Sequence, residues 1–269
     1  MVLPLPLKNR EVLKVDKANA RDEVYRQLAE VYDPELDQPL TELGFIGDVR
    51  IAGDKVTVRF RLPTYWCAAN FAYMMASDIR ERVSELAWVK RVDVMLQDHF
   101  HDEEINEGIK HGKTFQTAFP DATDGLDELR ETFRVKAFQA RQERVLRWLI
   151  RKGIQEEAIL RMRVGELEQL LKKRQVAKLV KRYLNIRQER GLPDDIGAEA
   201  FSHHDGTPID PGGLQLLLNK ASSTRLSMEF NTAFCSGLLK TRYGEDKQGL
   251  KNADLEKDKT KESTGVIEA

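Results

Sequence analysis

The residue most able to do chemistry in this sequence is a cysteine that stands directly before a helical pattern. Cys67 closes the short segment 63–67, and apolar residues at helical spacing follow at positions 68–86. Backbone N–H groups and the helix dipole at a helix start stabilise a thiolate. A thiolate binds iron and attacks sulfur donors, so the sequence predicts a reactive thiol at Cys67. Without further signals, a lone cysteine is more often a small buried hydrophobic side chain.

Two acidic residues follow the first helical pattern of the chain. Asp33 and Glu35 flank Pro34, and a proline disfavours helix in the residue before it, so the helix ends there. If this helix end packs near the exit of the second strand, a carboxylate and the Cys67 thiolate face one shallow site. Thr64 is a candidate for the same site, or for a turn or helix cap. Asp33 and Glu35 alternatively act as a turn former and a solvated acid.

The elements that would hold these residues follow from the spacing of apolar side chains. In chain order they are a helix from Asn19, strands at 45–51 and 56–62, a helix at 68–86 and a strand at 92–96. Gly53-Asp54 between the first two strands is typical of a hairpin turn. The simplest packing is a three-stranded sheet with helices on one face. We therefore predict a small two-layer α+β domain at residues 19–102.

The rest of the chain divides by composition. Residues 103–124 are polar, which predicts a linker with at most one short helix. Residues 125–243 show helical spacing without alternation, which predicts an all-α region. Its expected helices lie at 126–152, 156–162, 164–171, 175–190, 214–221 and 225–242. Residues 244–269 are charged and almost free of aromatic residues, which predicts a disordered tail.

Composition and motifs exclude several classes of protein. The net charge of −1 over 269 residues argues against a chain that binds nucleic acid by charge alone. No run approaches the roughly 20 apolar residues that span a bilayer. The two cysteines, Cys67 and Cys235, form no C-x-x-C motif and suit a reducing compartment. Nucleophile elbow, P-loop, dinucleotide and zinc-protease motifs do not occur. We therefore expect a cytoplasmic protein that binds no membrane and is not an enzyme.

Three short motifs together resemble the pattern of the metal–sulfur cluster assembly factor family. One follows the first helix, one precedes the first strand, and one opens the second helix. In chain order they are Asp33-Pro34-Glu35, Leu43-Gly44 and Pro63-Thr64 with Cys67. Members of this family contain an iron–sulfur cluster assembly domain. They include the phenylacetate-degradation accessory protein and a eukaryotic cytosolic iron–sulfur targeting factor. The resemblance covers only the N-terminal third of the chain. Relatives frame the cysteine with small residues such as Gly-Cys-Pro, whereas Cys67 lies between Trp66 and Ala68, so Trp66 either shields the thiol or contacts a partner.

The resemblance implies an accessory factor that matures iron–sulfur or other metal centres. It implies that Cys67, Asp33, Glu35 and Thr64 contact the iron or cluster, with Cys67 as the metal ligand. One thiolate is too few for a cluster, which takes about four protein ligands, so we expect only transient iron or cluster binding. Dimerisation would supply a second Cys67. Expected partners are the iron–sulfur assembly machinery and a client metalloprotein, for example a component of a multicomponent di-iron oxygenase.

Histidines supply further metal-ligand candidates. His99 and His101 would point the same way from an extended strand, and His111 would add a third ligand. Short histidine clusters in polar segments are more often solvated. His203 and His204 are weaker candidates, because they lie in a loop rich in glycine and proline.

A basic run at residues 172–190 supports an alternative function. It suggests a regulatory protein whose C-terminal helices contact nucleic acid, although a solvated helix face has the same pattern. Lys178, Lys181 and Arg182 are expected on the solvent side of this helix, where they would steer the client. Cys235 lies among apolar residues at helical spacing, which predicts a core position.

Overall fold

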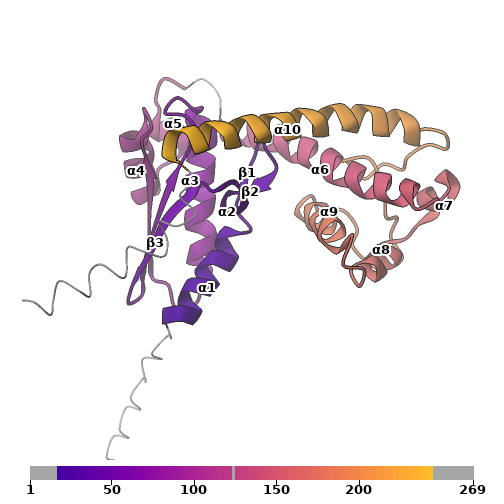
Figure 1. The fold of residues 1–269 in the computed structure, drawn as a ribbon, viewed down its shortest axis with the longest axis horizontal. Coiled ribbons are helices and arrows are strands. Elements are labelled where there is room, and N and C mark those ends of the chain that lie inside the picture. Colours follow the sequence, from indigo (N-terminus) through magenta and orange to yellow (C-terminus); the bar gives the residue numbers. More distant parts are fainter. Residues whose placement is uncertain (1–16, 123–124, 245–269) are drawn as a thin grey trace, which may run out of the picture.

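The computed structural model describes residues 17–122 and 125–244 and contains an α+β domain followed by helices (Figure 1). The predicted fold class is thereby confirmed. The buried hydrophobic side chains form two clusters, one within residues 24–115 and the other within residues 137–218. From residue 245 on, the predicted tail lies outside the described residues. No helix in the described ranges is long and apolar enough to cross a membrane.

The sheet is built as the alternation of its side chains requires. Its strands are β3 (Ile46–Ala52), β4 (Lys55–Arg61) and β5 (Arg91–Gln97), and its main helices are α1 (Lys17–Leu28) and α3 (Ala69–Ser84). β3 and β4 form an antiparallel hairpin, and β5 pairs with β4 in parallel after α3 crosses over. Val56, Val58 and Phe60 alternate along β4 and are fully buried in the same core cluster as the inner faces of α1 and α3.

The segment predicted as a linker is part of the α+β domain. It carries α4 (Asp102–Lys110) and α5 (Phe115–Ala118), and Ile105, Ile109 and Phe115 are buried in the domain core. Asn106 completes the packing, because its side chain bonds to both the N–H and the carbonyl of Leu96 on β5, at 2.7 and 3.0 Å. The linker prediction is therefore wrong for the described part of 103–124. The mostly polar composition of this segment made us overlook Ile105 and Ile109, which are spaced so that they lie on one face of a helix.

A short hairpin between α1 and the sheet was not predicted. It consists of β1 (Tyr32–Asp33) and β2 (Gln38–Pro39), and it leads into the single helical turn α2 (Leu40–Leu43). Gly44 ends α2 with a φ of +75°, which favours glycine because it has no Cβ. This hairpin carries the Asp33-Pro34-Glu35 motif.

Most helices of the all-α region begin and end close to their predicted limits. They are α6 (Leu126–Arg151), α7 (Glu156–Arg161), α8 (Val164–Leu170) and α9 (Ala177–Glu189). Their buried side chains, such as Phe138, Leu146 and Tyr183, form the second core cluster.

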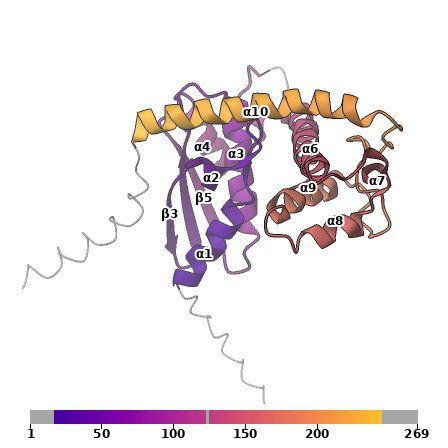
Figure 2. The same cartoon turned by 45° about the vertical axis from the view of Figure 1, so that its right-hand side comes forward.

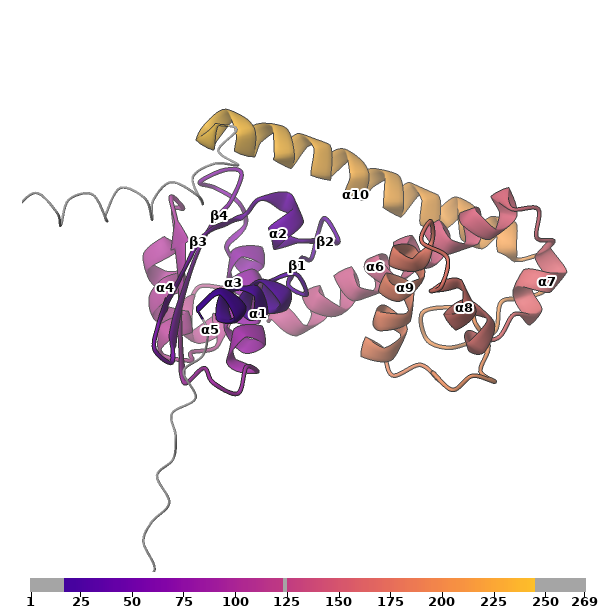
Figure 3. The ribbon, with the colours of Figure 1, turned by 60° about the horizontal axis from the view of Figure 1, so that its bottom comes forward.

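The last helix differs most from the prediction. Two helices were expected at 214–221 and 225–242, but α10 (Leu214–Tyr243) is one continuous helix of 30 residues. The predicted break at residues 222–224 does not occur, and Ser222 within it packs against α6, where it donates to Glu143 at 2.8 Å. Figures 2 and 3 show that α10 runs from the all-α region back over the α+β domain. Cys235 and Leu239 near its end pack against the first core cluster.

Candidate functional site

Cys67 lies at the end of a turn that leads into α3. Its Sγ is 3.2 Å from Oγ1 of Thr64, so the two predicted site residues share a hydrogen bond. The thiol is half-buried. Helix α3 begins at Ala69, and the N-cap residue Ala68 provides no side-chain cap. The first backbone N–H groups of the helix therefore receive no capping bond from that residue, and their dipoles favour negative charge at the adjoining turn.

His99 holds this turn from the other side. Its Nε2 lies 2.7 Å from the carbonyl oxygen of Cys67, and its Nδ1 accepts the backbone N–H of His101 at 3.1 Å. Because Nδ1 is an acceptor, Nε2 carries the proton and donates to Cys67. Burial lowers the pKa of His99 below its usual 6.5, which keeps the ring neutral. His99 therefore has both nitrogens engaged, Nε2 with the cysteine turn and Nδ1 with the backbone of His101.

The expected extended arrangement of the two histidines is wrong. β5 ends at Gln97, and Asp98 has a φ of +55°, which turns the chain before His99 and His101. The two rings are tilted and their centroids are 6.1 Å apart. The ring of His101 instead packs edge-on against Phe119.

The Asp33-Pro34-Glu35 motif forms a turn around the Asp33 side chain. Oδ1 of Asp33 accepts the backbone N–H groups of Glu35 and Leu36, each at 2.9 Å. The carboxyl group is buried, and burial raises its pKa from 3.8 to about 6, against the opposing effect of the two N–H bonds. The Asp33 carboxyl group therefore loses its proton as the pH rises through about 6.

The C-terminal part of α10 touches each of the three motif segments. Asn231 donates to Glu35 of the first motif at 3.3 Å. A Cβ added to Gly44 of the second motif would meet Leu239 at 3.6 Å. Arg242 donates to the carbonyl of Leu62, directly before the third motif, at 3.3 Å. An element from the far end of the chain thus covers this surface of the α+β domain.

This cover packs the second cysteine against the same core cluster as the first. Burial raises the pKa of Cys235 to about 11, and the charges of Asp33, Cys67 and Glu35 add to the effect. Cys235 was predicted as a core residue, but it is half-buried and packs against the core of the α+β domain. The sequence carries no signal that both cysteines pack against one core cluster, because they stand in separate regions of the chain.

An exposed aromatic cluster adjoins Cys67. The ring of Tyr65 packs edge-on against Trp66 at 4.4 Å and against Phe100 at 4.5 Å between centroids. Trp66 and Phe100 are 62% and 66% exposed, so Trp66 does not serve as a buried shield. Such a cluster next to a site is a surface that a partner protein can cover.

The basic run is only partly a solvent face. Arg182 donates to the carbonyl of Asp37 and lies over the ring of Tyr32, and Arg187 is buried and donates to three loop carbonyls. The expectation that Arg182 faces solvent is therefore wrong. Lys178 is exposed but pairs with Glu42 at 2.7 Å. Of the three residues named for steering, Lys181 remains exposed without an ion pair among the described residues.

A buried ionic junction, which we did not predict from the sequence, joins the α+β domain to the all-α region. Asp37 has a side chain that is 1% exposed, and Arg141 of α6 donates to its Oδ1 at 2.7 Å. Arg144 and Arg182 lie 3.6 Å from its Oδ2. The ring of Tyr32 stacks with Arg141, whose guanidinium carbon is 4.8 Å from the ring centroid. The charge pattern alone does not reveal which of many arginines meet one aspartate.

The remaining histidine candidates lie apart from Cys67. His203 and His204 occupy a loop between α9 and α10, where Asp205 accepts from the backbone and hydroxyl of Thr207. His111 bonds to Glu107 on the surface of α4 at 3.0 Å. Within residues 17–122 and 125–244, no three histidine, cysteine or acidic side chains are grouped to hold a metal ion.

Comparison with known proteins assigns a family to the part that carries Cys67. Residues 21–94 match the model of a family described as iron–sulfur cluster assembly protein. An uncharacterized protein of Methanocaldococcus jannaschii is 34% identical over 92 residues, which are 34% of this chain and 94% of that protein. The family match includes Asp33, Glu35, Thr64 and Cys67 and excludes α10.

Proposed function

Because the chain belongs, through its N-terminal domain, to the iron–sulfur cluster assembly protein family, we propose that it is a non-enzymatic factor that carries iron or a cluster to a client. The family supports a general role in iron–sulfur cluster assembly. It also supports contact with assembly machinery or client proteins in general. The transient carrier and adaptor roles are the finer parts of the proposal.

The arrangement of side chains around Cys67 supports this proposal. The thiol hydrogen-bonds to Thr64, its turn is held by His99, and Cys235 of α10 packs against the same core cluster. A stable cluster takes about four protein ligands, and Cys67 supplies one thiolate. Cargo held here is therefore incompletely ligated, and groups of a donor, a client or a second copy of the chain complete its coordination. Incomplete ligation suits a protein that passes its cargo on.

The client is the least specified part of the proposal. The resemblance to the phenylacetate-degradation accessory protein favours a multicomponent oxygenase with a di-iron or iron–sulfur centre. The exposed cluster of Tyr65, Trp66 and Phe100 offers a contact surface beside the cargo site. We place this exchange in the cytoplasm, where thiols stay reduced.

The nucleic-acid alternative receives less support. It relied on the basic run as a continuous solvent face, but Arg182 and Arg187 are engaged in internal contacts. Fewer free cations remain to follow a phosphate backbone.

Replacement of Cys67 by serine tests the proposal in the native host. Strains that lack the gene would be complemented with the wild type or with Cys67→Ser and grown with radioactive iron. We expect Cys67→Ser to lower the radioactive iron recovered in iron–sulfur proteins several-fold, as the deletion does, while circular dichroism shows a folded protein. The matched variant Cys235→Ser should lower it less, because burial raises the pKa of that thiol to about 11. Equal iron incorporation in the deletion strain and the wild type would overturn the proposal.

A further inference from the structure

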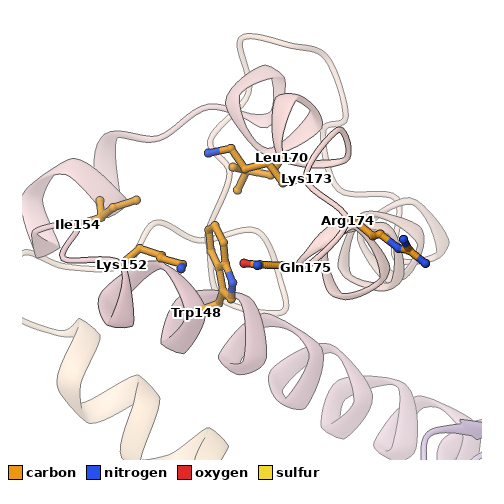
Figure 4. A pocket seen from close by; sticks show the side chains of 7 residues that line it. All are labelled: Trp148, Lys152, Ile154, Leu170, Lys173, Arg174 and Gln175. Carbon is orange, nitrogen blue, oxygen red and sulfur yellow. The ribbon is translucent and has the colours of Figure 1, made fainter.

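A hollow of about 680 Å³ lies in the all-α region, on elements that the site at Cys67 does not use (Figure 4). Trp148 of α6, Ile154 and Leu170 form its apolar wall. Lys152, Lys173, Arg174 and Gln175 complete the lining. Figure 4 shows the indole of Trp148 standing between α6 and the segment that carries Leu170 and Lys173, with Gln175 pointing toward it.

The apolar wall lies at the edge of the second core cluster and is partly open to solvent. Trp148, Ile154 and Leu170 are each half-buried and pack against that cluster. Their remaining apolar area faces the hollow rather than another side chain. A volume of this size falls within the range of small-ligand pockets, and it accommodates one large side chain with its neighbours.

The rim carries positive charge that the protein does not neutralise. Lys152, Lys173 and Arg174 are exposed, and no ion pair joins any of them to another described residue. Lys152 lies 5.6 Å from the centroid of the Trp148 ring. Residues 169–188 contain seven lysines and arginines and no acidic residue. An anionic group is thus favoured at the rim of an otherwise apolar hollow.

We propose that this hollow binds a peptide segment of a partner protein, with a bulky apolar side chain against Trp148 and flanking carboxylates on the lysines and Arg174. The apolar wall and the cationic rim each match one part of such a segment. Nucleic acid fits less well, because single strands stack successive bases on several aromatic rings, and Trp148 is the one aromatic residue in the lining of this hollow. The assignment of the partner as the client rests on the proposed function. Binding of the peptide itself does not.

Fluorescence anisotropy with the full-length protein tests this site. The probes are fluorescein-labelled short peptides with two glutamates on each side of a central phenylalanine, tryptophan, leucine or alanine. We expect saturable binding of the first three peptides and affinity lower by about tenfold or more for the alanine peptide, because alanine buries much less apolar surface against Trp148. Trp148→Ala and Lys173→Glu should each lower the affinity for the phenylalanine peptide by a similar factor.

Lys181→Glu is the matched control, because it makes the same charge change in the same basic run outside the hollow. We expect it to change the affinity by less than about twofold. Lys173→Glu is an exposed substitution, so it remains informative if Trp148→Ala unfolds. The proposal is overturned if no peptide saturates, if the alanine peptide binds as well as the phenylalanine peptide, or if both lysine variants lose equal affinity. Tighter binding of single-stranded DNA that displaces the peptide would instead assign the surface to nucleic acid. Each of these failures leaves the radioactive-iron experiment on Cys67 unaffected.

Discussion

Two of the contacts between the all-α region and the α+β domain differ in character. At the junction, Asp37 is buried and faces Arg141, Arg144 and Arg182. At the cover, α10 lies over the Cys67 surface with half-buried side chains and single hydrogen bonds, such as Asn231 to Glu35. Loss of one partner in a buried ionic cluster leaves an uncompensated charge, whereas loss of one half-buried contact does not. We therefore predict that the junction stays closed and that the cover is the contact that opens over the Cys67 surface.

Removal of Arg141, the central arginine of the junction, should give the largest loss of stability. Arg141→Ala leaves Asp37 buried beside two more distant arginines, and we expect a loss of about 3–5 kcal/mol in the free energy of unfolding. Chemical denaturation followed by circular dichroism measures this loss. The matched control is Arg50→Ala, which removes an arginine from an exposed pair with Asp48 and should cost less than about 1 kcal/mol. If both variants lose equally little, the junction is not the stronger contact.

A smaller effect on stability is expected at Asp33, a buried acid that forms no ion pair with another residue in the described ranges. The pKa of Asp33 is raised to about 6 by burial, so the folded state binds more protons than the unfolded chain between about pH 4 and pH 6. Stability from this group is fully present below about pH 4 and is lost as the pH rises through 6. Asp33→Asn keeps the acceptor for Glu35 and Leu36 and removes the charge. At neutral pH we expect it to be more stable than wild type by about 1–3 kcal/mol.

Denaturation of both proteins at several pH values measures this difference. It should shrink toward zero as the pH falls to about 4, because Asp33 is then neutral in both states. A difference that is independent of pH would show that the Asp33 carboxyl is already neutral or well solvated in the folded protein.

The smallest effect is expected at the cover, and it concerns access more than stability. In a Cys235→Ser background, Leu239→Ala removes packing between α10 and the motif surface at a cost of about 1 kcal/mol. Such a loss raises the population of a locally opened state by about fivefold. Labelling of Cys67 with a maleimide should accelerate by a similar factor. The control is Leu226→Ala on the exposed side of the same helix, which should leave the rate unchanged. Equal rates in all three proteins would mean that α10 does not limit access to Cys67.

The pattern of side chains in the sequence determined the local architecture. The alternation of Val56, Val58 and Phe60 determines a strand with one buried face, and helical spacing determines α3 and α6 close to their limits. The motifs around Asp33 and Cys67 determine tight turns, and the family match covers them. These features depend on neighbours within a few residues, so a single sequence contains their signal.

The packing of whole elements sets which distant side chains meet. Nothing local distinguishes Cys235 from a core cysteine, and its place against the core of the α+β domain results from α10 continuing through Ser222 and packing on both parts of the molecule. Arg141 is likewise one of many arginines, and its role arises because α6 brings it to buried Asp37. Contacts of this kind depend on how whole elements pack, since packing selects among many equivalent surface residues. The sequence therefore determined the turn that carries Cys67, and the fold determined what covers it.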